Sequence, residues 1–327
     1  MKVNFVGSFT TGYVGEVSDE SHLAREIETL GHEVRRLPRD KWREHVLTGA
    51  TYPDMPTDLE ADINIVAKWN GFNDGRFVSA LRQESGGAPV FYWVWDYMQN
   101  EDWHLKMVEE ADLYLANDVY SGNYDHFSNC YYFPFDVSDG EIDKTGPDYE
   151  SIKRRNVAFF GSWIAQGDRQ EWLQKINREV PVTVFSWNWQ EWPKEFTDVH
   201  PAVYGLEFAN EVGITRICLG FSVYSHAWGY WSNRTGKILS VGGFLLYQYA
   251  PGMELFLQDG VVYFSSPEEA VEKIRYYLDS KHEQERWRIA LKGYRIGRNR
   301  FISAERVKEL MILAERFIKK GDVIWKL

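Results

Sequence analysis

One stretch of this sequence carries the residue types of a phosphate-binding site at a suitable spacing. Ser232 can cap a helix expected from about Asn233 to Ser240, whose free N–H groups and positive dipole end would then face an anion. Arg234 adds a planar guanidinium that matches phosphate oxygens. Gly242 and Gly243 end the helix before an apolar strand over 244–247. The pattern predicts a diphosphate site, and an ordinary helix with a solvated arginine is the alternative.

The same stretch resembles the carboxyl-terminal donor domain of group 1 glycosyltransferases, in the spore-maturation-type glycosyltransferase-like branch. The motifs that carry the resemblance are Ser232-x-Arg234, Gly242 to Leu246, Pro251 to Glu254 and Asp259-Gly260. The resemblance implies an α/β fold of GT-B architecture, in which two Rossmann-like doubly wound domains face a central cleft. It also implies a nucleotide-sugar donor as co-substrate, with no cofactor. The residues expected to bind the donor are Gly161, Ser162, Arg169, Trp187, His226, Tyr230, Trp231, Ser232, Asn233, Arg234, Lys237 and Glu254.

The sequence departs from the family at two acidic positions. The two donor-contacting glutamates of the wider family fall on Gly229 and Lys237 here, and a lysine cannot accept a ribose hydroxyl as the second glutamate does. No Asp-x-Asp pair occurs, so we expect no metal on the diphosphate. Its charge would then be met by Arg169, His226, Arg234, Lys237 and helix dipoles. The resemblance favours a retaining reaction.

Strands and helices alternate along the chain, which predicts parallel sheets with crossover helices. The length of 327 residues favours two domains. We expect a Rossmann-like acceptor-side domain over 1–150, ending in a polar linker at about 138–152, and a donor domain over 151–303. In the family that the chain resembles, a terminal helix such as 304–327 crosses back to the first domain.

The expected acceptor and catalytic residues lie in the first domain. Loops after its strands bring Gly12, Tyr13, Gly15, Trp69 and Tyr97 to the acceptor side, although the glycines also suit a plain tight connection. Asp96 ends an apolar strand and can act as a base toward an acceptor hydroxyl, or it can cap the next helix. Glu16 and His22 are its competitors, and His22 also suits a place in the core.

Tryptophan is abundant, with 14 residues, and indoles stack on sugars and on nucleobases. Trp93 and Trp95 point to one face of a strand and can simply pack there. Trp187, Trp189 and Trp231 fall in loops or at strand ends, where exposure to a ligand is expected.

Charge, cysteines and motifs narrow the class of protein. Residues 1–150 carry 12 Lys+Arg against 28 Asp+Glu, a net of −16, while residues 151–327 carry 25 against 20, a net of +5. A mildly basic half suits an anionic donor, and a strongly acidic half repels polyanions, although an acidic surface that aids solubility explains the same split. The two cysteines lack metal-ligand spacing, and no hydrolase or zinc motif is present. With no apolar run long enough for a bilayer and no signal-peptide pattern, we expect a cytoplasmic protein.

Three functions remain open at this stage. The first is a metal-independent glycosyltransferase that moves a sugar from a nucleotide-sugar to a hydroxyl of a glycan or small molecule. The second is a phage-type enzyme that glycosylates hydroxymethylated bases in DNA, which the acidic first half disfavours. The third is a protein that keeps the fold and binds nucleotide-sugars without turnover. The sequence does not fix the oligomeric state.

Overall fold

The computed structural model describes residues 1–9, 19–67, 75–95, 102–134, 147, 154–164 and 167–320. The chain divides into two compact units. Unit 1 comprises Met1–Ser138 together with Ser303–Leu327, and unit 2 comprises Asp139–Ile302. The chain therefore leaves unit 1 once and returns to it with its last helix.

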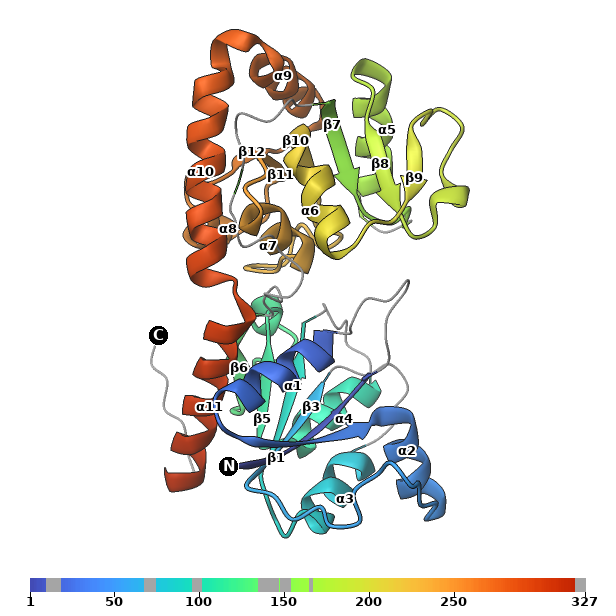
Figure 1. The fold of residues 1–327 in the computed structure, drawn as a ribbon, viewed down its shortest axis with the longest axis vertical. Helices are drawn as coiled ribbons and strands as arrows, with labels where there is room; N and C mark the ends of the chain where they lie inside the picture. Colours follow the sequence, from blue (N-terminus) through green and yellow to red (C-terminus); the bar gives the residue numbers. More distant parts are fainter. Residues whose placement is uncertain are drawn as a thin grey trace. The chain divides into compact units, whose positions relative to one another are not determined.

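Unit 1 is built on a six-stranded sheet in the order β2-β1-β3-β4-β5-β6 (Figure 1). Every pairing in it is parallel. Its strands are β1 (Lys2–Gly7), β2 (Glu33–Pro38), β3 (Ile63–Ala67), β4 (Val90–Val94), β5 (Leu113–Ala116) and β6 (Cys130–Tyr132). The middle strands β3, β4 and β5 are buried along their whole length, as expected for a parallel sheet covered on both faces. The sequence predicts six strands here, at 2–6, 32–37, 62–68, 89–95, 112–116 and 131–135, and the structure confirms six with ends shifted by a few residues.

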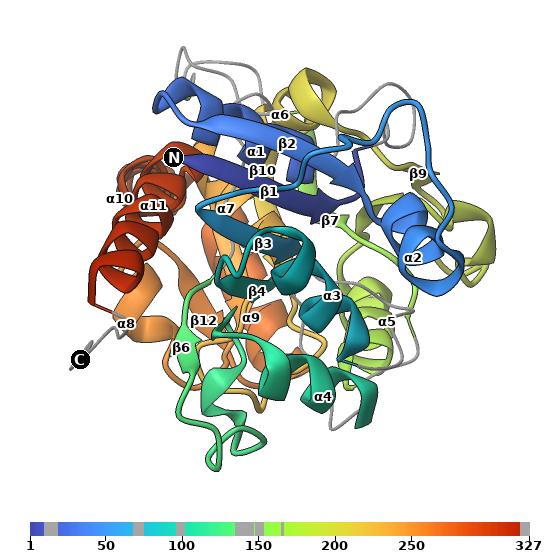
Figure 2. The ribbon, with the colours of Figure 1, turned by 90° about the horizontal axis from the view of Figure 1, so that it is seen from below.

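Helices cover both faces of this sheet (Figure 2). One face packs under α2, α3 and α4, and the other packs under α1 and α11. The helices of unit 1 are α1 (Asp19–Thr29), α2 (Arg39–Thr48), α3 (Arg76–Glu84), α4 (Asp102–Glu110), the short 3-10 helix η2 (Val119–Ser121) and α11 (Ser303–Lys320). The sheet is thus the middle layer of a three-layer unit.

The last helix, α11, packs beside α1 and closes one face of unit 1. The helical spacing of Val307, Leu310, Met311 and Ala314 in the sequence predicts an apolar stripe, and all four residues are buried. In α1, Leu23 and Ile27 are buried likewise. The sequence predicts one apolar stripe of His22, Leu23, Ile27 and Leu30 in this helix. Leu30 is a correction to it, because α1 ends at Thr29 and Leu30 is 43% exposed.

Unit 2 is built on a second six-stranded parallel sheet, in the order β12-β11-β10-β7-β8-β9 (Figure 1). Its strands are β7 (Arg155–Phe160), β8 (Thr183–Ser186), β9 (Val199–Pro201), β10 (Thr215–Gly220), β11 (Leu245–Gln248) and β12 (Val262–Phe264). Counted along the chain, the order is that of dinucleotide-binding folds, and it reverses between β7 and β10. Ligands of open α/β sheets bind beyond the carboxyl ends of the strands at such a reversal.

The helices of unit 2 are α5 (Arg169–Glu179), η4 (Trp189–Glu191), α6 (Gly205–Gly213), α7 (Asn233–Ser240), α8 (Met253–Leu257), α9 (Pro267–Leu278), η5 (Ser280–His282) and α10 (Glu283–Arg300). The sequence Ser266-Pro267-Glu268-Glu269 predicts a capping box at the start of α9, and the structure confirms it: the Ser266 hydroxyl accepts the Glu269 N–H at 3.1 Å. In return the Glu269 carboxylate accepts the N–H of Ser265 at 2.7 Å. Two orphan donors are therefore satisfied at this helix end.

The two units carry different charge from the two halves of the sequence. Unit 1 contains 17 Lys+Arg and 27 Asp+Glu, a net of −10, because the basic segment 303–327 belongs to it. Unit 2 contains 20 Lys+Arg and 21 Asp+Glu, a net of −1. The mildly basic donor half expected from the sequence is therefore a nearly neutral unit, and any preference for anions must come from local charges. Among the helices in the described ranges, none has the length and apolarity needed to cross a bilayer.

Candidate functional site

The loops that follow β7 and β10 meet at the carboxyl edge of the unit 2 sheet. The Gly161 N–H donates to the Phe185 carbonyl at 2.8 Å, which ties the end of β7 to β8. Gly167, at φ +59°, lies so close to the other loop that a Cβ on it would meet the Val223 carbonyl oxygen at 2.7 Å. A glycine is required there by both its backbone angle and this approach.

Arg234, in the first turn of α7, lies against the end of β7. Its guanidinium carbon is 5.7 Å from the centroid of the Phe159 ring. A Cβ on Gly161 would meet that carbon at 3.0 Å and Phe159 Cζ at 2.7 Å. Because Gly161 has no side chain, there is space beside it for the guanidinium of Arg234. Of the sequence predictions, Gly161 and Arg234 are brought together directly.

Arg169, the first residue of α5, also lies against Phe159. It is 2% exposed, its guanidinium carbon is 5.8 Å from the Phe159 centroid, and one of its nitrogens donates to the Ser162 carbonyl at 2.8 Å. Its Nε is buried without a hydrogen-bond partner. Arg169, Ser162 and Arg234 thus share one end of β7.

Arg169 and Arg234 place two positive charges around the ring of Phe159. Burial, and then the charge of Arg234, lower the pKa of Arg169 to about 9, and burial lowers the pKa of Arg234 as well. Tyr230 is close enough to both guanidinium groups to counter these pKa shifts slightly. Within the part of the chain that the structure describes, neither arginine forms an ion pair with an aspartate or glutamate. Buried charge of this kind is costly without a counter-charge, which an anionic ligand would supply.

The amino end of α7 adds donors to the arginine pair. The helix spans the residues predicted for it, Asn233–Ser240, and Ser232 occupies the N-cap position. The expected cap is wrong in one respect, because the Ser232 side chain makes no capping hydrogen bond. The first N–H groups of a helix have no partner within it. Asn233 Oδ1 is also buried without a partner, so this helix end has both donors and an acceptor to offer.

The loop after β8 lies next to this site and contains a residue that sequence reasoning missed. Asn188 is 6% exposed and its side chain bonds four groups: the N–H and carbonyl of Trp163, the Ser186 hydroxyl and the Glu191 carboxylate. Trp187 beside it is 60% exposed, as predicted for this loop. A short asparagine between two tryptophans is the only signal in the sequence that could have identified it.

Three other donor-side candidates occupy places that differ from expectation. Trp231 is 3% exposed and packs against Phe256 and Phe301, so its predicted exposure to a ligand is wrong. Tyr230 is 6% exposed and packs edge-on to Tyr224. Lys237 lies in the last turn of α7, about one helical turn beyond Arg234.

The remaining candidates are exposed, buried or outside the described residues. His226 and Glu254 are exposed, Glu254 in the first turn of α8. In unit 1, His22 is 8% exposed on the inner side of α1, in line with a core position. The other catalytic and acceptor-side candidates lie outside the described residues: Gly12, Tyr13, Gly15, Glu16, Trp69, Asp96 and Tyr97.

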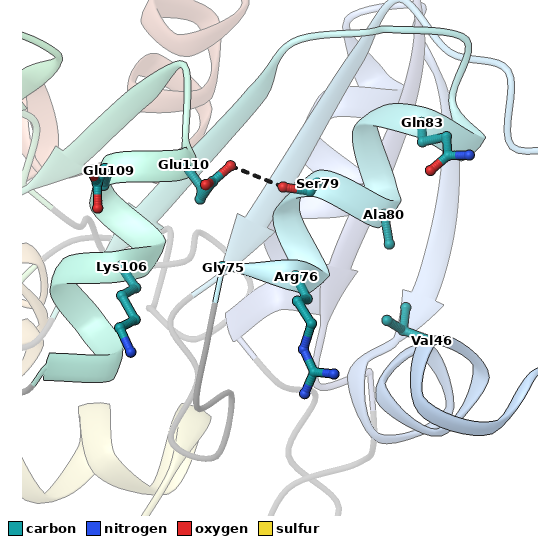
Figure 3. Close-up of a pocket in the computed structure, with 9 residues that line it drawn as sticks. All are labelled: Val46, Gly75, Arg76, Ser79, Ala80, Gln83, Lys106, Glu109 and Glu110. Atoms are coloured by element: carbon teal, nitrogen blue, oxygen red, sulfur yellow. Dashed lines mark hydrogen bonds between the residues drawn. The ribbon is translucent and has the colours of Figure 1, made fainter.

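A separate hollow lies on the helical surface of unit 1, between α3, α4 and the end of α2 (Figure 3). The Ser79 hydroxyl donates to the Glu110 carboxylate at 2.9 Å across it, while Arg76 and Lys106 extend in the same direction away from that bond (Figure 3). A second open hollow, between α5 and α9, is lined by Lys175, Arg178, Glu179, Glu268, Glu272 and Arg275. Both carry charges of both signs and favour no single class of ligand.

Comparison with known proteins identifies the class. A family model described as glycosyl transferase-like matches residues 167–312, which include Arg169 and Arg234. No curated protein matches the sequence significantly. The match and the fold agree with the enzyme class predicted from the sequence: the chain is a glycosyltransferase of GT-B architecture.

The solved structures that resemble the chain cover it almost completely. HepE from Anabaena, in complex with UDP and glucose, is 12% identical over 97% of this chain and 100% of its own, with a TM-score of 0.64. The sucrose-phosphate synthase of Thermosynechococcus elongatus is 8% identical over 97% of this chain and 99% of its own, at 0.66. A DNA-modifying β-glucosyltransferase is 14% identical over 96% of this chain and 100% of its own, at 0.59. At these identities the likeness shows the shared fold.

Proposed function

We propose that this chain transfers a sugar from a nucleotide-sugar to a hydroxyl of a glycan or small molecule, and that arginines rather than a metal ion hold the donor diphosphate. The observation that carries the proposal is the Arg169 and Arg234 pair at the end of β7. Burial lowers the pKa of both arginines, and the charge of Arg234 lowers the pKa of Arg169 further. A diphosphate removes that repulsion by adding two negative groups between them.

The surroundings of the pair suit the same ligand. The dipole of α7 places partial positive charge at Asn233 and Arg234, and the first N–H groups of the helix are available to phosphate oxygens. As the leaving diphosphate gains charge during transfer, these donors are already in position, which is the condition for electrostatic stabilisation of a transition state. HepE, which shares the fold, is known in complex with UDP-glucose.

The finer assignment rests on the family resemblance. The proposal includes the spore-maturation-type branch and a retaining outcome, with the ribose contact of the usual glutamate replaced. Gly229 and Lys237 stand at the two glutamate positions, and the Gly229 N–H donates to the Pro251 carbonyl at 2.8 Å. That bond fastens the loop before α7 to the turn before α8, so Gly229 has a structural role in this chain.

The acceptor is proposed to be a glycan or small molecule rather than DNA. Unit 1 carries a net of −10, which repels a polyanion and removes the counterion release that favours DNA binding. The proposal also places the protein in the cytoplasm, in line with two free cysteines, Cys130 and Cys218.

Titration calorimetry with pyrophosphate and UDP tests the diphosphate site. We expect Arg234→Ala to weaken both by about 1.5 to 3 kcal/mol, the scale of a charge-assisted contact, without loss of folding. Arg288→Ala, an exposed arginine on α10, is the matched control and should leave both affinities unchanged. Equal affinities for wild type and Arg234→Ala would remove this arginine from the site.

Two further measurements separate the enzyme from a binder and test the metal. Release of UDP from UDP-glucose in the presence of simple glycosides should occur in the wild type, and binding without release would indicate a protein that has lost turnover. Both binding and release should be the same with and without EDTA. A loss of either on addition of EDTA would refute the metal-independent form of the proposal.

A further inference from the structure

One tyrosine of unit 2 buries its hydroxyl without a hydrogen-bond partner. Tyr247, the third residue of β11, is completely buried. Its hydroxyl forms no hydrogen bond with any residue in the part of the chain that the structure describes. A buried hydroxyl that makes no hydrogen bond destabilises a fold, because it has given up its bonds to water. Such a group in a folded protein therefore needs an explanation.

A glycine on the next strand makes space for the ring of Tyr247. The register of β10 and β11 sets Gly220 opposite Tyr247. A Cβ on Gly220 would meet Tyr247 Cδ2 at 2.4 Å and Leu245 Cδ1 at 2.9 Å. The ring therefore fills the space that a side chain at position 220 would take. Glycine in a strand often marks such a close approach, and here it fixes where the phenol lies.

The phenol lies beside the first turn of α7, which carries Arg234. Burial raises the pKa of Tyr247 to about 12, and three neighbours act in the opposite direction: Thr235, Arg234 and Ser222. Thr235 belongs to the first turn of α7, and Ser222 follows β10 closely. In the same way, burial lowers the pKa of Arg234 and Tyr247 opposes that shift. The hydroxyl therefore keeps its proton and lies near the Arg234 side chain.

We propose that Tyr247 is a positioning residue of the diphosphate site, whose hydroxyl accepts an N–H of the Arg234 guanidinium while that group holds the ligand. The inference rests on the proposed function and adds to it a residue from a neighbouring strand. In the structure the two groups are neighbours without this bond, so the bond forms on binding. A guanidinium has five N–H donors, so one can go to the phenol while others go to phosphate oxygens. Because the phenol is completely buried, it acts through Arg234 and does not touch the diphosphate.

The test uses a substitution that removes only the hydroxyl. Tyr247→Phe should weaken pyrophosphate binding roughly tenfold in titration calorimetry, the scale of a hydrogen bond to a charged group. The midpoint of urea unfolding should not fall, because the deleted hydroxyl has no partner in the fold. A merely structural hydroxyl would give the opposite pattern, with a loss of stability and an unchanged affinity.

Tyr263→Phe is the matched control. Tyr263 lies opposite Tyr247 on β12, and its hydroxyl is likewise buried without a partner among the described residues. Its ring packs edge-on to Tyr249, and the charge that acts on it is that of Glu254 rather than that of Arg234. This variant should leave both the pyrophosphate affinity and the unfolding midpoint unchanged. An equal loss of affinity in the two variants would overturn the inference.

A double-mutant cycle tests whether the hydroxyl acts through Arg234. In the Arg234→Ala background, Tyr247→Phe should cause no further loss of pyrophosphate affinity, because the group that it positions is gone. A further tenfold loss in that background would overturn the inference, as would an unchanged affinity in Tyr247→Phe alone. The proposed function is tested separately by Arg234→Ala. If Arg234→Ala weakens pyrophosphate binding and Tyr247→Phe does not, only the inference about Tyr247 fails.

Discussion

Each unit buries a group of polar side chains near the carboxyl edge of its sheet, and the two groups differ in how they are satisfied. In unit 1, Asp118 follows β5 and is fully buried, and it accepts the hydroxyls of Tyr114 and Tyr124 at 3.0 Å each. His104 lies between Tyr124, at 3.0 Å, and Tyr92, at 3.2 Å. Burial and the charge of Asp118 raise the pKa of all three tyrosines, so their hydroxyls remain donors.

In unit 2 the charges of buried Arg169 and half-buried Arg234 are alike in sign and lack an acid among the described residues. A satisfied network stabilises and orders the fold, whereas a desolvated pair of like charges destabilises it until a counter-ion binds. The comparison shows that burial of charge alone does not identify a site. The candidate site is distinguished by the lack of an acidic partner for its arginines among the described residues.

The largest effect should come from breaking the satisfied network. Asp118→Ala leaves the hydroxyls of Tyr114 and Tyr124 without their acceptor, and we expect a loss of about 3 kcal/mol in the free energy of unfolding. Pyrophosphate affinity should be unchanged. Urea denaturation measures the first and calorimetry the second.

The control for that variant is Asp125→Ala, an exposed aspartate in the same segment, with an expected change within about 0.5 kcal/mol. If Asp118→Ala cost no more than its control, the network would not be a stabilising element and the contrast between the units would fail.

A smaller effect, on pyrophosphate affinity, should follow from a substitution that crowds Arg234 beside Arg169. In Gly161→Ala the new Cβ would stand 3.0 Å from the Arg234 guanidinium carbon, and the guanidinium must move. We expect pyrophosphate affinity to fall roughly tenfold, about 1.4 kcal/mol, with the fold retained. Gly213→Ala is the control, since its Cβ would meet nothing within 4 Å. An unchanged pyrophosphate affinity in Gly161→Ala would show that the position of the Arg234 guanidinium beside Gly161 is not needed for binding.

Much of this fold follows from local sequence patterns. The strands of both sheets are short apolar runs between turn residues, and α9 and α11 carry a capping box and an apolar stripe that specify them. β9 has three residues and none of them is buried, so no apolar run in the sequence predicts this strand. α10 holds six Lys and Arg residues with Gly293 and Gly297 on its inner face, which is a poor helix pattern. Those glycines are explained only by the close approach of Gly260 and Ser240.

The site was predictable only in part, for a physical reason. Arg234 lies at the start of a helix and Gly161 at the end of a strand, and local sequence patterns predict both positions. Their contact across 73 positions depends on the strand order, which no local pattern contains. Trp231 was expected to be exposed because it falls in a loop or at a strand end, yet Phe301 from a distant segment packs against it.

The smallest effect should come from an exposed polar contact that is satisfied, His45 with Glu84 in unit 1. His45 Nδ1 lies 2.8 Å from the Ala50 carbonyl and Nε2 lies 3.0 Å from the Glu84 carboxylate. Only the protonated ring can donate to both. Burial lowers the pKa of His45, but the Ala50 carbonyl and Glu84 together raise it above its ordinary value.

Because the folded pKa is the higher one, the stability that this contact adds is complete below the unfolded pKa of about 6.5 and is lost as the pH rises through the folded value. Glu84→Gln should therefore cost less than about 1 kcal/mol at pH 5 and less again at pH 8. NMR titration should show the pKa of His45 falling in the variant. A larger cost at pH 8 than at pH 5 would contradict this assignment of protons, and a cost comparable to that of Asp118→Ala would mean that burial does not set the strength of these networks.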